Sequence, residues 1–297
     1  MRLSTANTSD NVLAQLQRLS RQQADLQNKI STGQRVFQPG DDPAAVGRIV
    51  TAQSEERALH QFQRNASAAL EYSKTSYSGL AQFKTISDRA GELSVLGAGA
   101  NGAQAMQAYA AEVNQLIEQA STQGNTRFRN DYVFGGTAVD APPFALTRDG
   151  AGQITSSIYA GDTGRLRVPI ADGATIEPTP APATNTGLSD FMNNLIALRD
   201  ALQAGDGAAV QASRLGLEAS EDLLVSSLSE HGAVQLRIEV GQAQQQSRLD
   251  EIQRQVSAEA DVDLPATIVR LSQTTQAYEA ALSSAALILR MSLLDHL

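Results

Sequence analysis

The C-terminal end of the chain carries apolar residues at alternating spacings of four and three. This heptad spacing keeps one face of a helix turned toward a partner helix. The pattern runs on into leucines at the last positions, so the sequence predicts an amphipathic helix that something else must cover. Its members are Leu264, Ile268, Leu271, Thr275, Tyr278, Leu282, Ala285 and Leu289, followed by Leu293, Leu294 and Leu297.

The N-terminal end repeats the same spacing and predicts a second amphipathic helix over about residues 8–32. Gln23 is the one polar residue in its seam, whose other members are Val12, Leu16, Leu19, Leu26 and Ile30. We expect the two terminal helices to pair as a coiled coil. An ordinary intramolecular hairpin is one explanation of the seams, and packing against neighbouring subunits is the other, which we favour because long helix pairs are marginal alone.

Helix boundaries follow from glycine, proline and aspartate. Gly33 can take the left-handed position after the first helix, and Asp42-Pro43 matches an N-cap followed by the first helical residue. No proline falls between Ala44 and Leu96, which predicts one very long helix. Glycines in 97–102 interrupt it, and a shorter helix is expected over about 103–123.

Residues 124–187 differ in composition, since they hold six of the nine prolines. Three stretches are strand-like, with glycine turns between them: Tyr132–Phe134, Gln153–Tyr159 and Arg165–Ile170. Helix resumes near Leu188 and again over about 208–259, and Asp263 is a candidate N-cap for the terminal helix.

The predicted fold is mainly α with an inserted small β domain. We expect an elongated rod of long antiparallel helices, with the N- and C-terminal helices paired as a coiled coil. The expected segments are an N-terminal coiled-coil helix and turn, long rod helices, the β domain, returning rod helices and a C-terminal coiled-coil helix, over 1–43, 44–123, 124–187, 188–259 and 260–297.

Composition excludes several classes of function. The net charge is −9 with no basic block, so neither nucleic acid nor a membrane is an expected partner. The chain has no cysteine, which excludes disulfides, thiolate nucleophiles and cysteine metal sites. The N-terminus lacks the apolar segment of a cleavable signal peptide, and the C-terminal apolar run, broken by Arg290, is too short to span a membrane.

No catalytic constellation emerges. Gly97, Gly99 and Gly102 fit a dinucleotide-binding spacing, but no strand precedes them, so a helix interruption is the better explanation. Asp41-Asp42 could serve acid–base chemistry, although the following proline favours capping. The three histidines are far apart in the sequence. We therefore predict no enzyme activity, no cofactor and no metal site.

Particular stretches resemble a known family. Met1–Thr5, Gln27–Val36 and Pro39–Ala45 resemble the N-terminal region of the flagellin-like axial proteins. The hook-associated protein 3 family within that group is resembled by four stretches: Asn130–Gly136, Asp140–Phe144, Leu264–Leu271 and Ser292–Leu297. The residues that carry the N-terminal motif are Arg2, Ser4, Thr5, Ser31, Thr32, Gly33, Arg35, Val36, Asp41, Asp42 and Pro43.

The resemblance implies a structural subunit at the junction of flagellar hook and filament. Its expected partners are further copies of itself in a ring layer, the other hook-associated junction protein on the hook side, and flagellin on the filament side. A flagellar export chaperone would bind the C-terminal helix, and the type III apparatus would export the chain to the cell exterior without a cleaved signal peptide. The expected subunit contacts are Val12, Leu16, Leu19, Leu26, Ile30, Leu264, Ile268, Leu271, Tyr278, Leu282, Leu289, Leu293, Leu294 and Leu297.

Two alternatives remain open at this point. One is a short flagellin that forms the filament itself. The other is a ligand-binding or enzymatic function carried by the β insertion.

Overall fold

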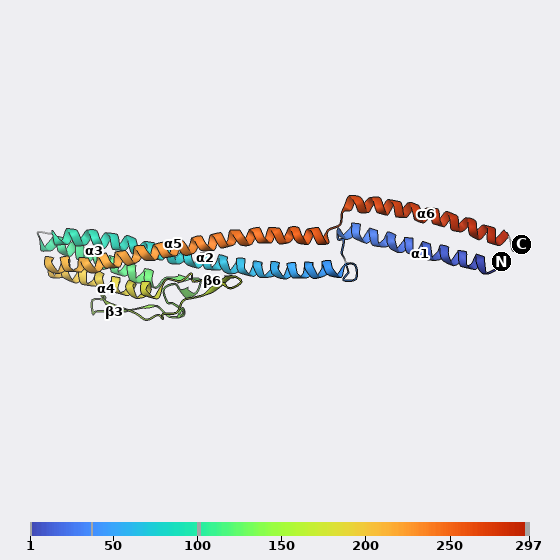
Figure 1. Ribbon diagram of the computed structural model, residues 1–297. Helices are drawn as coiled ribbons and strands as arrows, with labels where there is room; N and C mark the ends of the chain where they lie inside the picture. Colours follow the sequence, from blue (N-terminus) through green and yellow to red (C-terminus); the bar gives the residue numbers. More distant parts are fainter. Residues whose placement is uncertain (1, 37, 100–101, 295–297) are drawn as a thin grey trace. The chain divides into compact units, whose positions relative to one another are not determined.

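The computed structural model describes residues 2–36, 38–99 and 102–294, with side chains for 10–36, 38–99 and 102–287. The described chain is mainly α-helical, and all its strands lie between α3 and α4, which confirms the predicted fold class (Figure 1). The helices are α1 (Arg2–Thr32), α2 (Pro43–Ala98), α3 (Ala103–Gly124), α4 (Pro182–Ala204), α5 (Gly207–Ala260) and α6 (Leu264–Leu294). The strands are β1 (Arg127–Phe128), β2 (Asp131–Tyr132), β3 (Phe144–Arg148), β4 (Ile154–Tyr159), β5 (Val168–Ala171) and β6 (Ala174–Ile176).

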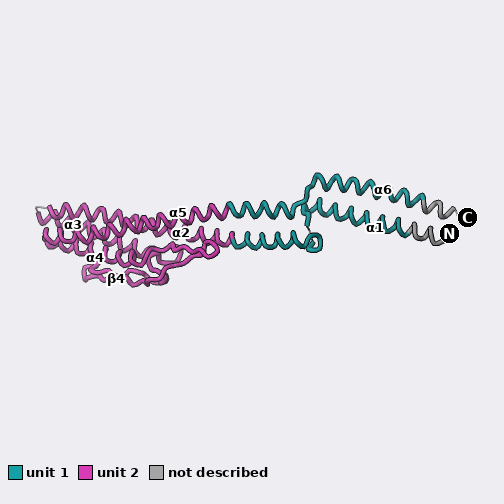
Figure 2. The backbone as a smooth tube through the Cα atoms, in the orientation of Figure 1, with its two compact units in different colours: residues 1–58, 247–297 teal, residues 59–246 magenta. Residues whose placement is uncertain are grey.

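The chain forms two compact units (Figure 2). The first comprises residues 1–58 and 247–297 and holds α1, α6, the beginning of α2 and the end of α5. The second comprises Leu59–Gln246. The sequence predicts five segments, which are divided at the ends of helices and strands. The two units are divided by packing instead, so the division into five segments stays a prediction.

Local side-chain chemistry sets several helix ends as predicted. Gly33 follows α1 with φ of 72°, a backbone conformation that glycine adopts without steric cost. The Asp42 carboxylate accepts a hydrogen bond from the Ala45 backbone N–H (3.0 Å) at the start of α2. Asp263 caps α6 in the same way, through the Ala266 N–H (3.0 Å). Each cap satisfies a donor that the first turn leaves unpaired.

Two helices begin earlier than the sequence predicts. α1 begins at Arg2 rather than near residue 8, and α4 begins at Pro182 rather than near Leu188. Proline occupies the first turn of α4, where its missing N–H costs nothing. Thr184 and Asn185 in the following turn are buried, so tertiary packing extends this helix into a stretch that reads as loop.

The glycines at 97–102 interrupt the helix, as predicted. α2 ends at Ala98 and α3 begins at Ala103. A Cβ atom on Gly97 would lie 2.4 Å from the Leu202 Cδ2 atom and 3.4 Å from Val210 Cγ1. Gly97 therefore allows α2 to pack closely against the end of α4 and the beginning of α5.

The strands form three antiparallel pairs, β1–β2, β3–β4 and β5–β6. The predicted strand Gln153–Tyr159 is confirmed as β4, and Arg165–Ile170 overlaps β5. The strand predicted at Tyr132–Phe134 is wrong beyond its first residue, because Val133 and Phe134 leave β2 and enter the core. β1, β3 and β6 were not predicted, since each is short and has only a local partner.

Asparagine side chains bind the β3–β4 pair to the helices. The Asn193 amide on α4 accepts from the Ser157 N–H and donates to the Ser157 C=O, both at 2.9 Å. Asn125, just after α3, makes the same pair of bonds with Phe144, at 3.1 and 3.2 Å. A side-chain amide here replaces a neighbouring strand, so the edge of β4 is satisfied at this point.

An aromatic cluster lies at the centre of the second unit's core. Phe83 of α2 contacts Phe134 and Phe191 edge-to-face, with ring centroids 5.9 and 6.1 Å apart. A Cβ atom on Gly79 would lie 2.8 Å from the Phe134 ring, so glycine makes room for that ring against α2. All three rings are fully buried, and this unit has a core of its own.

His231 is a buried polar group within the same unit. It is 3% exposed, and its Nδ1 atom lies 3.3 Å from the Ser73 hydroxyl of α2. Burial lowers the pKa of His231 to about 4, with opposing effects from Glu230, which raises it, and Arg165, which lowers it. Its ordinary value is 6.5, so the unfolded chain binds this proton more readily than the folded chain.

Acidification should therefore destabilise the second unit through His231. The loss of unfolding free energy that His231 causes is absent above pH 6.5 and grows as the pH falls. It approaches its full value of about 3 kcal/mol near pH 4. Urea unfolding at pH 7 and pH 4.5 should show His231→Gln losing less stability on acidification than the unchanged chain. His60→Gln, at an exposed position, is the control, and an equal loss in all three chains would contradict the expectation.

Candidate functional site

α1 and α6 lie side by side in the first unit and run antiparallel (Figure 1). Backbone hydrogen bonds tie their adjoining connections together: the Arg35 N–H donates to Ala260 (2.6 Å), and the Val262 N–H donates to Gly33 (2.9 Å). Gln34 and Asp261 form an antiparallel bridge between these bonds. The predicted pairing of the terminal helices is confirmed.

The α1 seam is largely covered in this pair. Leu26 is 7% exposed, and the remaining predicted members are partly buried: Val12, Leu16, Leu19 and Ile30. α6 is the element that packs along α1. The seam residues of α1 therefore pack against α6 of the same chain.

The α6 seam is divided between the inside and the outside of the pair. Leu271 and Tyr278 are partly buried. By contrast, Leu264, Ile268 and Leu282 are exposed, at 42%, 53% and 44%. Leu289, Leu293, Leu294 and Leu297 lie outside the residues whose side chains are described.

Two threonines occupy inner positions of α6 that the sequence pattern missed. Thr267 and Thr274 are each 7% exposed. Their hydroxyls donate to the carbonyls of Asp263 (2.7 Å) and Arg270 (2.8 Å), one turn earlier. Because the hydroxyl is satisfied within its own helix, the methyl side can be buried. A count of apolar residues alone cannot find such positions.

Further apolar side chains of the terminal pair are uncovered. Leu13 of α1 is 56% exposed, and Val269 and Leu287 of α6 are 56% and 62% exposed. Single exposed apolar residues are common on protein surfaces, so the relevant feature here is that six aliphatic residues are exposed along one helix pair. We call the exposed aliphatic residues the uncovered face; they are Leu13, Leu264, Ile268, Val269, Leu282 and Leu287.

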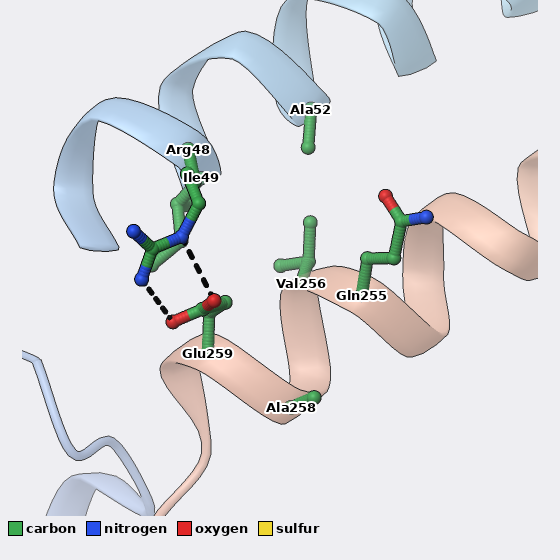
Figure 3. Close-up of a pocket in the computed structure, with 7 residues that line it drawn as sticks. All are labelled: Arg48, Ile49, Ala52, Gln255, Val256, Ala258 and Glu259. Carbon is green, nitrogen blue, oxygen red and sulfur yellow. Dashed lines mark hydrogen bonds and ion pairs between the residues drawn. The ribbon is translucent and has the colours of Figure 1, made fainter. Parts of the chain in front are cut away.

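A cluster of charges joins the ends of α2 and α5 beside this pair (Figure 3). Arg48 forms a two-pronged ion pair with Glu259, with Nε–Oε1 and Nη2–Oε2 distances of 2.9 Å each. The pair borders a recess of about 270 Å³, otherwise lined by Ile49, Ala52, Gln255, Val256 and Ala258.

Electrostatics favours the ionised carboxylates in this cluster. Hydrogen bonds from the Arg48 guanidinium hold the pKa of Glu259 below its usual range. The Ala45 N–H, followed by the Arg35 guanidinium, lowers the pKa of Asp42. Both groups therefore stay charged at neutral pH and keep their partners.

Other kinds of site find no support in the described residues. No group of histidine, aspartate and glutamate side chains there has the geometry to hold a metal ion. None of the described helices combines the length and apolar character that crossing a membrane requires.

Comparisons with known proteins identify the fold. Residues 3–138 match the model of the bacterial flagellin N-terminal helical region. No curated protein matches the sequence. Solved structures do match in fold, and the chain has the fold of the flagellin-like hook-associated proteins.

Three such structures show the extent of the likeness. A Vibrio parahaemolyticus protein described as flagellar hook-associated is 16% identical with a TM-score of 0.65, over 74% of this chain and all of that one. Bacillus cereus FlgL is 19% identical with a TM-score of 0.61, over 70% and 99%. Legionella pneumophila hook-associated protein 3 is 12% identical with a TM-score of 0.57, over 71% and 98%.

In this flagellin-like fold, the motif residues gather where α1 connects to α2. The Thr32 hydroxyl donates to the Asn28 carbonyl (2.8 Å), and Asp41 accepts from the Gln38 N–H (2.8 Å). The other described members lie in the same stretch: Ser31, Gly33, Arg35, Val36, Asp42 and Pro43. Side chains of Arg2, Ser4 and Thr5 lie outside the described residues. The described motif therefore shapes a connection between helices rather than a catalytic cleft.

Truncating the covered seam should loosen the terminal pair. Leu26→Ala removes a buried side chain and should cost about 2 kcal/mol, since leucine truncations in cores cost at least that much. Amides of α1 and α6 should then exchange with deuterium about thirtyfold faster. Leu13→Ala, at an exposed position of the same helix, should change exchange little, and equal effects of both variants would contradict the assignment.

Proposed function

We propose that this chain is a structural, non-enzymatic subunit of the bacterial flagellum that forms the junction layer between hook and filament. It assembles through its terminal helices with other copies of itself. On either side it meets the other hook-associated junction protein and flagellin. The fold shared with hook-associated proteins supports this role.

The uncovered face of the terminal pair carries the proposal. At about 100° per residue, Leu264, Ile268 and Leu282 fall within about 40° of one another around α6. Val269 and Leu287 share a different direction on the same helix. α1 covers the stripe that adjoins the Leu264 direction, which includes Thr267 and Leu271. A helix that is apolar in several directions is normally surrounded by other helices.

The small core of the first unit supports the same conclusion. Its fully buried apolar residues, among those described, are Leu26, Ala45, Leu249 and Ile252. Such a core gives a long helix pair little stability of its own. Neighbouring subunits that cover the uncovered face would supply the missing burial, whereas a private hairpin would leave those side chains in water.

Export and handling before assembly follow as parts of the proposal. The chain would reach the cell exterior through the flagellar type III apparatus without a cleaved signal peptide. A flagellar chaperone that binds α6 would cover its apolar surface until then. Copurification with such a chaperone should be lost when α6 is removed.

A short flagellin is the second candidate, because the matching family model describes a flagellin region. Deletion of the gene in the source bacterium separates the two roles. A junction protein predicts that filament subunits are secreted but fail to polymerise on the hook. If the filament subunit itself disappears, the chain is a flagellin.

Charges on the uncovered face should block assembly without unfolding the chain. Ile268→Glu with Leu282→Glu should abolish attached filaments, because burying two unpaired carboxylates at an interface is costly. Unfolding of the free chain should shift by no more than about 0.5 kcal/mol, as for most surface changes. Filaments counted by electron microscopy give the readout.

Ala277→Glu with Ser284→Glu is the matched control. Both residues are exposed on α6 and lie about 60° or more around that helix from every α6 residue of the uncovered face, so the same added charge should be tolerated. Normal filaments in the Ile268/Leu282 variant would contradict assembly through this face.

A further inference from the structure

The two connections that lead into the terminal helices are held together by charge. Arg35, in the connection after α1, donates from its Nη2 atom to the Glu259 carbonyl (2.7 Å) and approaches the Glu259 carboxylate (3.4 Å). Its Nη1 atom lies 3.4 Å from Asp42. Arg48 of α2 holds the same carboxylate from the other side. One glutamate thus links α2, the α1–α2 connection and the end of α5.

Nearby carboxylates have other roles. Asp261 accepts a hydrogen bond from the Ser257 hydroxyl. Asp263 caps α6, and Asp41 accepts from the Gln38 N–H. Glu259 is therefore the carboxylate that both guanidiniums share.

Apolar packing contributes little where α2, the α1–α2 connection and the end of α5 meet. The recess beside the ion pair is lined by short side chains at Ala52 and Ala258. The inner face of α6 is also poor in shape-specific contacts, since Thr267, Thr274, Ala281 and Ala285 alternate with Leu271 and Tyr278. Small, similar residues repeated along a seam allow a helix to slide past its partner, and buried or paired polar groups are what fix a register.

We propose that Arg35, Arg48 and Glu259 form a charge latch that fixes the register in which α6 pairs with α1. The latch holds the Gln34–Asp261 bridge, from which both helices extend. Register decides which α6 residues α1 covers, because a shift of one residue rotates a helical position by about 100°. These three residues would thus determine which α6 side chains form the uncovered face. That this matters for assembly rests on the proposed function.

Spin-label distances test the latch in the free chain. The sequence has no cysteine, so Gln22→Cys and Gln273→Cys provide unique labelling sites, both exposed, about a dozen residues from the bridge on each helix. The unchanged latch should give a narrow distance distribution by pulsed electron paramagnetic resonance. Glu259→Gln and Arg48→Glu should each broaden it about twofold, as the ends of the helices gain freedom.

Charge conservation separates a latch from a simple packing role. Arg48→Lys changes the shape of the side chain but keeps a positive charge beside Glu259, and it leaves Arg35 and its acceptors unchanged. This variant should keep a distribution narrower than that of Arg48→Glu. Raising the salt from about 0.05 M to about 1 M should broaden the distribution of the unchanged chain but not that of Glu259→Gln, because salt screens exposed charges.

Lys29→Gln is the matched control, since it removes the Lys29–Asp25 ion pair within α1 and should leave the distances unchanged. Circular dichroism should show equal helix content in all variants. Narrow distributions in both Glu259→Gln and Arg48→Glu, or an Arg48→Lys distribution as broad as that of Arg48→Glu, would overturn the latch. Since these measurements need no flagellum, they succeed or fail independently of the junction role, which the filament counts test.

Discussion

α6 presents more apolar surface than α1 can cover. A helix pair buries one stripe on each partner, yet the aliphatic side chains of α6 extend past one edge of that stripe and also lie in a second direction around the helix axis. Thr267, Leu271, Thr274 and Tyr278 are covered, while Ile268 and Leu287 remain 53% and 62% exposed. Water penalises such surface at about 25 cal/mol per Å². This uncovered area on the terminal helix pair is the observation that supports the proposed assembly with neighbouring subunits.

Different interactions stabilise the two units. The second unit buries an aromatic cluster around Phe83 and binds its strands to its helices through Asn193 and Asn125, so it has a large core of its own. The first unit has few buried apolar residues and relies on backbone bonds and the Arg48–Glu259 pair at the helix connections. Exposed ion pairs contribute little free energy individually, so their value here is geometric. The small side chains between α1 and α6 would allow several registers of the two helices, and the ion pairs favour one of them.

The sequence predicted the helices far better than the strands. Heptad spacing over many turns, the Asp42 and Asp263 caps and Gly33 are local signals, and the helices and helix ends that they predict are present in the structure. β1, β3 and β6 are short, and residue types carry little information about pairing that depends on a neighbour. The α4 start at Pro182 shows the same limit, because buried contacts of Thr184 and Asn185 extend a helix into a proline-rich stretch.

For the candidate site, the sequence by itself determined which residues are apolar, how they are spaced and where the connecting turns fall. These follow from helical periodicity and from the backbone preferences of glycine, proline and aspartate. The tertiary structure decided which half of the α6 seam faces α1, since that depends on register and not on spacing. It also decided that Arg35 and Arg48 meet at Glu259, more than 200 residues away in the sequence. No local pattern encodes such a meeting, because only the return of α5 beside α2 brings those charges together.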